Sequence, residues 1–305
     1  MKLPKLCLFF VFSLSPIPAL ADSYIASLTH LAEHGDIAAQ VSLAKLYTGQ
    51  LRVGGINLPN DPNLATLWYT KAAEQGHIQS QVSLARLYMN GEAKDEKKAM
   101  EWYQKAAAAG EPDAIFQLGL GLLRGIGGLT KDPKKGVQYL EKASELSYSE
   151  ASCWLGNCYG DKNNYMYKPN GEKLKQLEAN GYGLKEDKKK ALDWYNKGAS
   201  QGDDMAACAL GFAYSRGELT AKDLVKAHVW STLGTSVGRL GKENNVHFDF
   251  EKEMRPEQLQ EAKQLLDVYL PRFKSAKDAN NRRRSEVNEM IVQKDKQLEE
   301  STNRK

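Results

Sequence analysis

Two histidines have a spacing that could serve metal chemistry. His30 and His34 lie four residues apart in a segment with helical periodicity, so both side chains point to one face of a helix. A catalytic zinc ion needs three protein ligands, and no third ligand is obvious nearby in the sequence. His34 also stands where this helix is expected to end, a position that suits a cation because of the helix dipole. The pair therefore predicts no metal site.

One serine and one lysine match the S-x-x-K motif of penicillin-recognising enzymes, in which the serine is the nucleophile. The match is Ser42-Leu43-Ala44-Lys45. One internal repeat later the same slot reads Ser83-Leu84-Ala85-Arg86, and neither S-D-N nor K-T-G accompanies it. The match is a by-product of repetition and does not indicate acyl transfer.

The glycines of GLGLLRGIGGLTK, residues 119–131, fit neither a P-loop nor a strand-led dinucleotide motif. They are interpreted as packing and turn glycines. Catalysis needs a nucleophile or a metal with an activating partner, and no such constellation is found in the sequence. We therefore expect a protein that is not an enzyme, with no cofactor.

Three cysteines lie within the repeats, namely Cys153, Cys158 and Cys208. An odd number cannot pair completely. Cys153 and Cys158 are five residues apart on an expected helix, so their side chains point about 140° apart. They are interpreted as small buried hydrophobic residues. A disulfide between Cys208 and one of the others stays an open alternative.

The elements that must position any site are internal repeats. A nonamer returns five times, as WYTKAAEQG (68–76), WYQKAAAAG (102–110), YLEKASELS (139–147), WYNKGASQG (194–202) and WSTLGTSVG (230–238). Each nonamer follows a second block, namely AAQVSLAKLY (38–47), QSQVSLARLY (79–88), DAIFQLGLGLL (113–123), EASCWLGNCY (150–159) or MAACALGFAY (205–214). The i, i+4 spacing predicts an amphipathic helix for each block. A period near 36 residues is typical of a solenoid of helix pairs.

Two features of the blocks predict how the helices pack. The equivalent leucine of the first block is always followed by Ala or Gly, which lets two backbones approach closely. The aromatic residue that opens the second block, such as Trp102, is expected to fill the wedge between neighbouring helices. Asp61-Pro62 and Asp132-Pro133 are expected to begin second helices, because Asp suits the N-cap and Pro the first helical position.

The pattern of Leu-Gly, Tyr and then KA…WY.KAA.QG resembles the Sel-one-like repeat family, a relative of tetratricopeptide repeats. The resemblance covers residues 35–240 and implies a secreted bacterial member. It implies an all-α fold, a right-handed α/α superhelical solenoid of about five helix-turn-helix repeats. The third unit departs from the pattern, with Leu122 for Tyr and Ser147 for Gly. Insertions at 51–60 and 161–180 lengthen two of the turns.

The ends of the chain differ from the repeats. Residues 1–21 combine two lysines, an apolar run and Ala19-Leu20-Ala21, which is typical of a secretory signal peptide. The run is too short to span a bilayer, so we expect a periplasmic or secreted protein, cleaved near Ala21, with no stable membrane anchor. Residues 22–34 and 241–271 are predicted as N- and C-terminal capping helices. Residues 272–305 are predicted as a charged tail, helical or disordered.

The charge of the chain argues against nucleic acid as a partner. The net charge is +4, and removal of the signal peptide with its two lysines leaves +2, which is close to neutral. From Arg272 onward there are ten basic and six acidic residues, so the tail carries the positive charge.

The resemblance to tetratricopeptide repeats implies a concave face lined by the first helix of each pair. By that analogy the exposed lining mixes apolar and basic residues: Lys45, Arg86, Met89, Phe116, Leu120, Leu123, Arg124, Asn157, Phe212 and Arg216. Such a surface suits an acidic, amphipathic segment of a partner protein. The alternative is that these side chains close the gap between adjacent helices. A second candidate is the loop with Tyr165, Met166 and Tyr167 in the longer insertion.

The predicted function is a non-catalytic protein–protein interaction scaffold or adaptor, which binds an envelope protein or another partner through the concave face. The alternative that the resemblance implies is an immunity protein that neutralises a toxic effector, such as a type VI secreted phospholipase. A cell-wall enzyme, such as a penicillin-binding hydrolase, is disfavoured by the missing catalytic residues.

Overall fold

The computed structural model describes residues 17–52, 58–91, 94–160, 182, 184–217, 219–236 and 250–302. Every regular element in these residues is a helix. The elements are α1 (Ile17–Glu33), α2 (Ile37–Tyr47), α3 (Pro62–Glu74), α4 (Ile78–Asn90), α5 (Glu96–Ala108), α6 (Pro112–Arg124), α7 (Pro133–Glu145), α8 (Glu150–Tyr159), α9 (Lys188–Ser200), α10 (Asp204–Arg216), α11 (Leu224–Ser236), the 3-10 turn η1 (Phe250–Glu253) and α13 (Pro256–Thr302).

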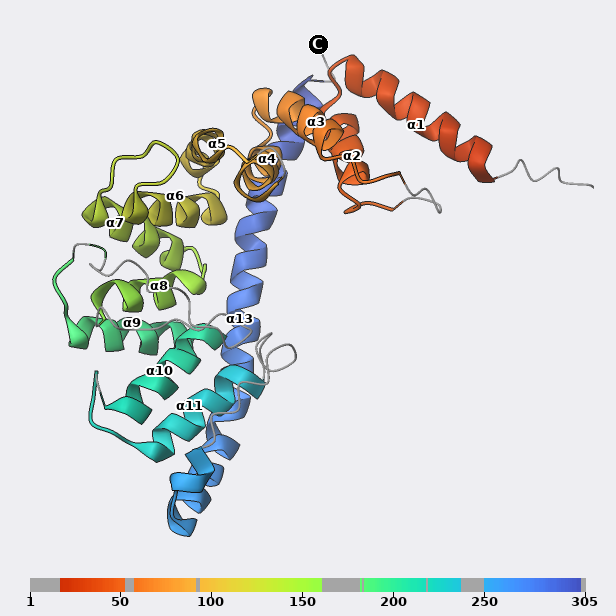
Figure 1. Ribbon diagram of the computed structural model, residues 1–305. Helices are drawn as coiled ribbons and strands as arrows, with labels where there is room; N and C mark the ends of the chain where they lie inside the picture. Colours follow the sequence, from red (N-terminus) through yellow and green to blue (C-terminus); the bar gives the residue numbers. More distant parts are fainter. Residues whose placement is uncertain are drawn as a thin grey trace, which may run out of the picture.

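The helices from α2 to α11 form five antiparallel pairs that stack into a right-handed solenoid (Figure 1). We call α2, α4, α6, α8 and α10 the A helices and α3, α5, α7, α9 and α11 the B helices. Each A helix packs on the B helix that follows it and on the B helix before it. The fold class expected from the sequence is therefore confirmed, and α1 packs on α2 at the amino-terminal end.

Local sequence signals set the ends of the helices as expected. Asp61 and Asp132 accept hydrogen bonds from backbone N–H groups in the first turns of α3 and α7, with Pro62 and Pro133 in first position. Glycines after the B helices have a positive φ, for example +96° at Gly76, which a residue with a side chain rarely adopts. In the third repeat Ser147 takes this place and still has a φ of +63°.

The tiny residue of each A helix lies directly against the partner B helix. A Cβ atom added at Gly119 would lie 2.9 Å from the side chain of Leu140. A Cβ atom added at Gly156 would clash with the ring of Tyr195. In the first two repeats Ala44 and Ala85 share a buried cluster with Tyr69 and Tyr103 respectively. This close approach confirms the role predicted for the small residue.

The B-helix aromatic residue that fills the core differs between repeats. We predicted that the tryptophan closes the wedge, and Trp68 of the first repeat is 6% exposed within the core, but Trp102 and Trp194 are only half-buried. The residue that follows the tryptophan is fully buried: Tyr103 is 1% exposed and Tyr195 is 0% exposed. The rotation of the B helix about its axis explains this, because the small residue of the A helix faces the position after the tryptophan. The tryptophans lie beside it, where Lys105 stacks on the Trp102 ring at 3.7 Å.

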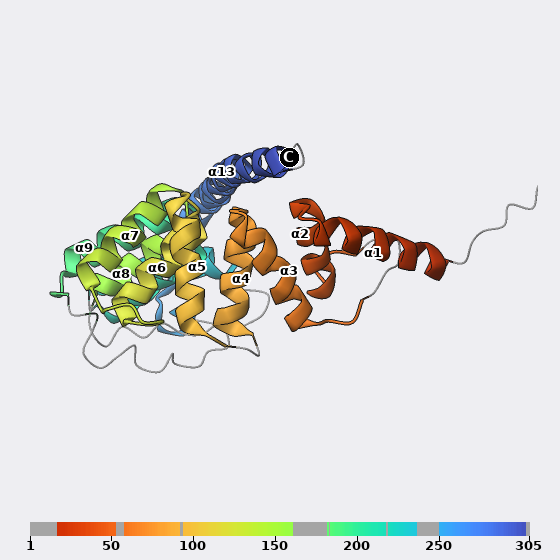
Figure 2. The same cartoon turned by 90° about the horizontal axis from the view of Figure 1, so that it is seen from above.

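The C-terminal part differs most from the sequence expectation. We expected a capping helix to Pro271 and then a charged tail, helical or disordered. The tail is helical, and it continues the capping helix without a break, so that α13 is one helix over 47 residues with Pro271 inside it. It runs back along one side of the stack, and its C-terminal end reaches the first repeats (Figures 1 and 2). Phe273, Asn280, Ile291 and Asp295 are buried along its inner side. The tail is thus a brace along the edge where each B helix ends and the next A helix begins.

One contact of this brace is an N-cap supplied from a distant part of the chain. Asp295 accepts hydrogen bonds from the N–H groups of Ile78 and Gln79 at 2.6 and 3.0 Å. The local cap residue of α4 is His77, where α2 and α6 have Asp36 and Glu111. Burial lowers the pKa of His77, whose Nδ1 accepts from the Ser80 N–H. Asp295 therefore restores the negative charge that a helix N-terminus favours.

Further along the edge, basic groups of α13 meet acidic groups and carbonyls of the turns. Lys277 lies 2.6 Å from an Asp204 carboxylate oxygen, and Lys294 donates to the Ala109 carbonyl at 3.2 Å. Asn280 donates to the carbonyl of Ser147, the residue with the strained positive φ. A Cβ at Gly202 would clash with the backbone of Lys277. The positive charge of the tail thus serves its docking on an acidic edge.

The burial pattern generates a prediction about core packing. Tyr103→Ala should lower the free energy of unfolding by about 3–5 kcal/mol, because it empties a fully buried site. Trp102→Ala, its direct neighbour, should cost about 1–2 kcal/mol, since its ring is half-exposed and stacked on a lysine. Urea titration followed by circular dichroism measures both. Equal costs, or a larger cost at Trp102, would contradict the assigned wedge.

Candidate protein-interaction surface

The predicted lining residues fall into two groups in the structure. Lys45 of α2, Arg86 of α4 and Arg216 of α10 are exposed, and four others are half-buried: Met89, Arg124, Asn157 and Phe212. All belong to A helices, so they share the surface that we call the A-helix face. Partner binding at this face stays a prediction, because no partner is present.

Three predicted lining residues are not exposed. Phe116, Leu120 and Leu123 of α6 are 6%, 9% and 0% exposed and belong to the largest buried cluster. Phe116 stacks on Tyr148 at 4.7 Å and meets the edge of Trp154 at 6.5 Å. The expectation of exposure is wrong for these residues: Tyr148 and Trp154 cover Phe116, and Leu123 packs against Gly136 of α7. They close the gap between helices, which is the alternative considered from the sequence.

Arg86 is held by an acidic partner at the edge of the A-helix face. Its Nε and one terminal nitrogen donate to Asp113 Oδ2 at 3.2 and 2.9 Å. The other oxygen of Asp113 accepts from the Tyr148 hydroxyl at 2.9 Å. Arg284 of α13 stacks on the Tyr148 ring at 4.4 Å. This network ties the second repeat, the third repeat with the turn that follows it, and the brace together. The charge of Arg86 therefore also serves the fold.

Two other arginines lie on aromatic rings of the same face. The Arg124 guanidinium lies 5.0 Å from the centre of the Trp154 ring, and that of Arg216 lies 5.9 Å from Phe212. Trp154 was missed as a site residue. The sequence could have indicated it, because a tryptophan is exceptional at this position: the other four repeats have a serine, glutamine or alanine there. Stacked, half-buried aromatic residues beside cations provide contact area with little loss of side-chain freedom on binding.

The remaining predicted sites are accounted for as follows. Asn157 accepts a hydrogen bond from the Tyr195 hydroxyl at 2.6 Å, which orients its amide. Tyr165, Met166 and Tyr167 lie outside the described residues. Cys153, Cys158 and Cys208 are free and buried, as interpreted from the sequence.

The two histidines considered as metal ligands lie side by side in the structure. The rings of His30 and His34 stack on one another at 4.2 Å. Within the described ranges, no three His, Cys, Asp or Glu side chains are grouped so that they could hold a metal ion. The same ranges contain no helix whose length and hydropathy would let it cross a bilayer.

Two buried carboxylates cap A helices at the edge of this surface. Glu111 accepts from the Ala114 N–H at 2.6 Å, and Asp203 caps α10 in the same way. Burial raises the pKa of Glu111 from 4.5 to about 7, although the Ala114 N–H acts in the opposite direction. Burial also raises the pKa of Asp203 from 3.8 to about 6.

These raised pKa values predict how stability depends on pH. Between pH 4.5 and about 7 the folded state keeps a proton on Glu111 that the unfolded chain releases. Stability from this group is therefore fully present below pH 4.5 and is lost as the pH rises through 7. Glu111→Gln keeps the cap acceptor but cannot titrate. Relative to the parent, its free energy of unfolding should rise by about 2–3 kcal/mol between pH 5 and pH 8.

Denaturant titrations at both pH values measure this difference. Asp203→Asn removes the titratable group at the equivalent cap of α10. Its free energy of unfolding, relative to the parent, should rise less between the two pH values, because the pKa of Asp203 is raised only to about 6. A difference between Glu111→Gln and the parent that does not change with pH would contradict the assignment.

Comparison with known proteins agrees with this geometry. The chain is 26% identical over 140 residues to chitin synthase regulatory factor 3 of Schizosaccharomyces pombe, a match that covers 46% of the chain. The match spans only 13% of that protein's length. A Sel1 repeat protein from Oxalobacter formigenes has a TM-score of 0.55 and 26% identity, over 80% of this chain and 93% of that one. Immunity protein Pa5087 from Pseudomonas aeruginosa, with a TM-score of 0.41 and 21% identity over 83% and 94%, shows a similar fold alone.

The family comparison follows the helix pairs. The model described as Sel1 repeat matches residues 37–77, 78–111, 112–148, 177–203 and 204–234. The fourth match begins within the long insertion and leaves out α8, which the structure shows as the A helix of that repeat. Together the matches cover more than half of the sequence. The chain therefore belongs to the Sel1 repeat family.

Proposed function

We propose that this chain is a non-catalytic scaffold of the bacterial periplasm or the secreted space, which binds an acidic segment of a partner protein on its A-helix face. One observation carries the proposal. Beyond their first two residues the five A helices contain no acidic residue, while Lys45, Arg86, Arg124 and Arg216 add cations to four of them. A face with one sign of charge favours partners of the opposite sign.

The cations share one line along the A helices. Lys45 and Arg86 stand at the same position of consecutive repeats, two residues after the equivalent leucine. Arg124 and Arg216 stand four residues further on, which is the same face of the helix one turn later. Met89, Trp154 and Phe212 are half-buried between them. An acidic segment with a few apolar side chains would find both kinds of contact there.

The amino terminus supports the proposed location. The first 21 residues have the order of a secretory leader, with lysines, an apolar run and small residues at the cleavage site. In an oxidising compartment exposed thiols are at risk, and the three cysteines of the repeats are buried. The role of an inhibitor of a secreted effector is one form of the same binding function.

The location predicts a defined mature end. Expressed in a bacterium with its native leader, the protein should be recovered from the periplasmic or culture fraction with Asp22 as first residue. Intact mass measurement and N-terminal sequencing of the purified protein check this. Recovery of the uncleaved chain from the cytoplasm would contradict the proposed location.

Partner binding predicts the effect of charge reversal on the A-helix face. Affinity capture from an envelope extract identifies the partner, and calorimetry then gives the Kd. The double variant Arg124→Glu, Arg216→Glu should weaken binding at least about tenfold, because two attractive charges become repulsive. Arg86 is left unchanged, since its loss would leave the buried carboxylate of Asp113 without its partner.

The matched control reverses two charges elsewhere. Lys263→Glu with Lys274→Glu makes the same change of net charge on exposed positions of α13 and should leave the Kd unchanged. Both variants should keep the helical circular dichroism of the parent. Unaltered affinity of the Arg124, Arg216 variant would refute binding at this face.

A further inference from the structure

The edge opposite the brace carries a row of lysines. It consists of the turns that lead from each A helix into its B helix, in the second to fifth repeats. The lysines are Lys94, Lys97, Lys98, Lys131, Lys134, Lys135, Lys185, Lys188, Lys189, Lys190, Lys222 and Lys226, and every one of them is exposed. We call this set the lysine rim. The described residues of these turns include six acidic residues, namely Asp95, Glu96, Asp132, Glu186, Asp187 and Asp223. The sequence adds Glu92 and Glu218 to the same turns.

The acidic residues of these turns are largely engaged with the backbone. Asp95, Asp132, Asp187 and Asp223 each accept a hydrogen bond at 3.0 Å from the N–H of the residue three positions later. Three of these four are half-buried. The caps thus face the helices, but several ammonium groups also pair with carboxylates of the same turns: Lys94 lies 2.8 Å from Glu96 and Lys226 lies 3.2 Å from Asp223. The lysines in excess of the acidic residues leave the described part of the rim with a net positive charge.

Helix stability does not explain the rim. A lysine in the first turn opposes the helix dipole, which favours a negative charge there. One lysine in three of the repeats has a packing role, because Lys98, Lys190 and Lys226 lie over tyrosine rings of the preceding A helices at 5.1–5.4 Å. Lys97, Lys134, Lys185 and Lys189 have no such ring contact among the interactions that the structure gives. Their recurrence calls for another cause.

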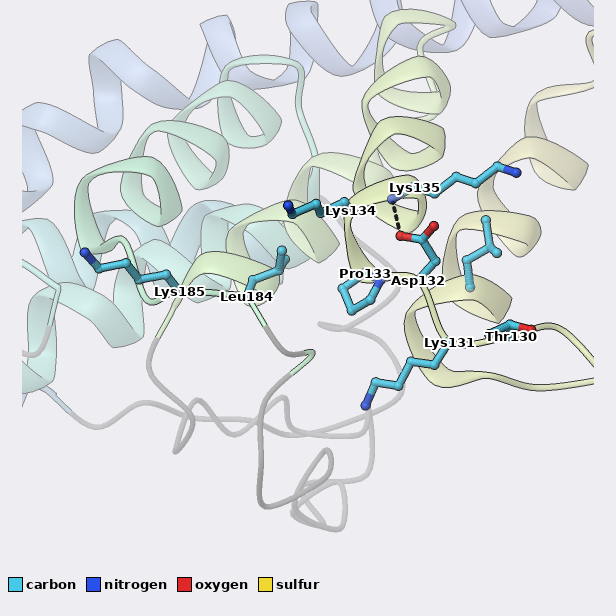
Figure 3. A pocket seen from close by; sticks show the side chains of 9 residues that line it. Thr130, Lys131, Asp132, Pro133, Lys134, Lys135, Leu184 and Lys185 are labelled. Atoms are coloured by element: carbon cyan, nitrogen blue, oxygen red, sulfur yellow. Dashed lines mark hydrogen bonds between the residues drawn. The ribbon is translucent and has the colours of Figure 1, made fainter.

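The third repeat shows how the rim is presented. Leu122 stands where the second, fourth and fifth repeats have tyrosine, and a hollow of about 600 Å³ opens beside it. Lys131, Lys134, Lys135 and Lys185 surround this hollow, with Asp132 as its acidic member. Their ammonium groups fan outward in different directions and do not meet at one point (Figure 3). This arrangement suits an extended anionic surface better than a single small anion.

The two edges of the solenoid differ in what they offer a partner. The brace edge has acidic turns and also buries Phe273 and Ile291 of α13, so a helix docks there by charge and apolar contact together. The exposed large hydrophobic residues of the described chain include none from the rim turns. The described part of the rim therefore offers a partner charge without exposed apolar side chains, which suits a layer of anionic lipid headgroups.

We propose that the lysine rim docks the protein reversibly on an anionic lipid surface, with the solenoid standing on this edge. Lysines from consecutive repeats stack along the solenoid, so their charges reach one plane together. Because the contact is made by exposed charges, it is screened by salt. The A-helix face and α13 lie on other elements and stay open to a protein partner.

Vesicle sedimentation tests this proposal with the full chain. Vesicles of phosphatidylcholine with about one third phosphatidylglycerol should bind the protein at low salt at least about tenfold more strongly than pure phosphatidylcholine vesicles, and about 0.5 M salt should abolish the difference. Any binding of the amino-terminal apolar run to lipid is common to both kinds of vesicle, so it does not produce the difference between them. Equal binding to the two kinds of vesicle at low salt would overturn the proposal.

A charge-reversal variant assigns the contact to the rim. Lys97→Glu, Lys134→Glu, Lys185→Glu and Lys189→Glu together should lower binding to the anionic vesicles at least about tenfold. In place of Lys97, Lys134 and Lys189, which lie in first helical turns, glutamate suits the dipole, and Lys185 is exposed ahead of α9. The variant should therefore fold, which circular dichroism checks. The control variant Lys263→Glu, Lys274→Glu, Arg282→Glu, Arg283→Glu changes the net charge equally on exposed positions of α13 and should bind as the parent does.

Each outcome decides the matter. Vesicle binding that survives in the rim variant, or that falls equally in the control, would refute the rim as the contact. Tight binding to a DNA duplex without binding to vesicles would assign the rim to nucleic acid and overturn the lipid proposal. Failure here leaves the Arg124, Arg216 test of partner binding untouched, because the two tests change different residues.

Discussion

The contact on which this structure depends is that between a tiny residue of each A helix and a fully buried residue of its B helix. At Gly156 no Cβ would fit beside the ring of Tyr195, and at Gly119 the side chain of Leu140 fills the space. Because this contact fixes both the distance and the rotation of the two helices, it decides which side chains enter the core. The tryptophans before Tyr103 and Tyr195 are turned aside by it and pair with lysines instead. One local constraint, repeated in each unit, thus sets the stack and its surfaces.

The stack separates charge between its two edges. The turns from B to A helices carry acidic residues such as Glu150, Asp203 and Asp204, and those from A to B helices carry the lysines. Helix α13 brings basic groups to the acidic edge, with Lys277 on Asp204 and Arg284 beside Glu150. It also supplies Asp295 where α4 has a histidine at its cap. The brace is therefore complementary in charge to the edge at these contacts, and it joins the fifth repeat to the first.

Three surfaces remain with different properties. The A-helix face combines arginines with half-buried aromatic rings, which suits a protein segment with acidic and apolar side chains. The lysine rim has charge without apolar contact, which suits lipid headgroups. The brace edge is already occupied by the chain itself. A scaffold built in this way could hold a protein partner on one face while another edge rests on a membrane.

The sequence alone determined the helix pairs, their number and most of their ends, because i, i+4 spacing, Asp-Pro caps and turn glycines act within a few residues. It also determined the basic character of Lys45, Arg86, Arg124 and Arg216. It did not determine that Phe116, Leu120 and Leu123 are buried, since their cover comes from other helices and from the turn after α7. Nor did it reveal the docking of the charged tail, whose partners His77 and Ile78 lie more than 200 residues away. Only the tertiary structure decides such contacts, because they depend on which groups the stacking of the repeats brings to one edge, and local spacing carries no information about that.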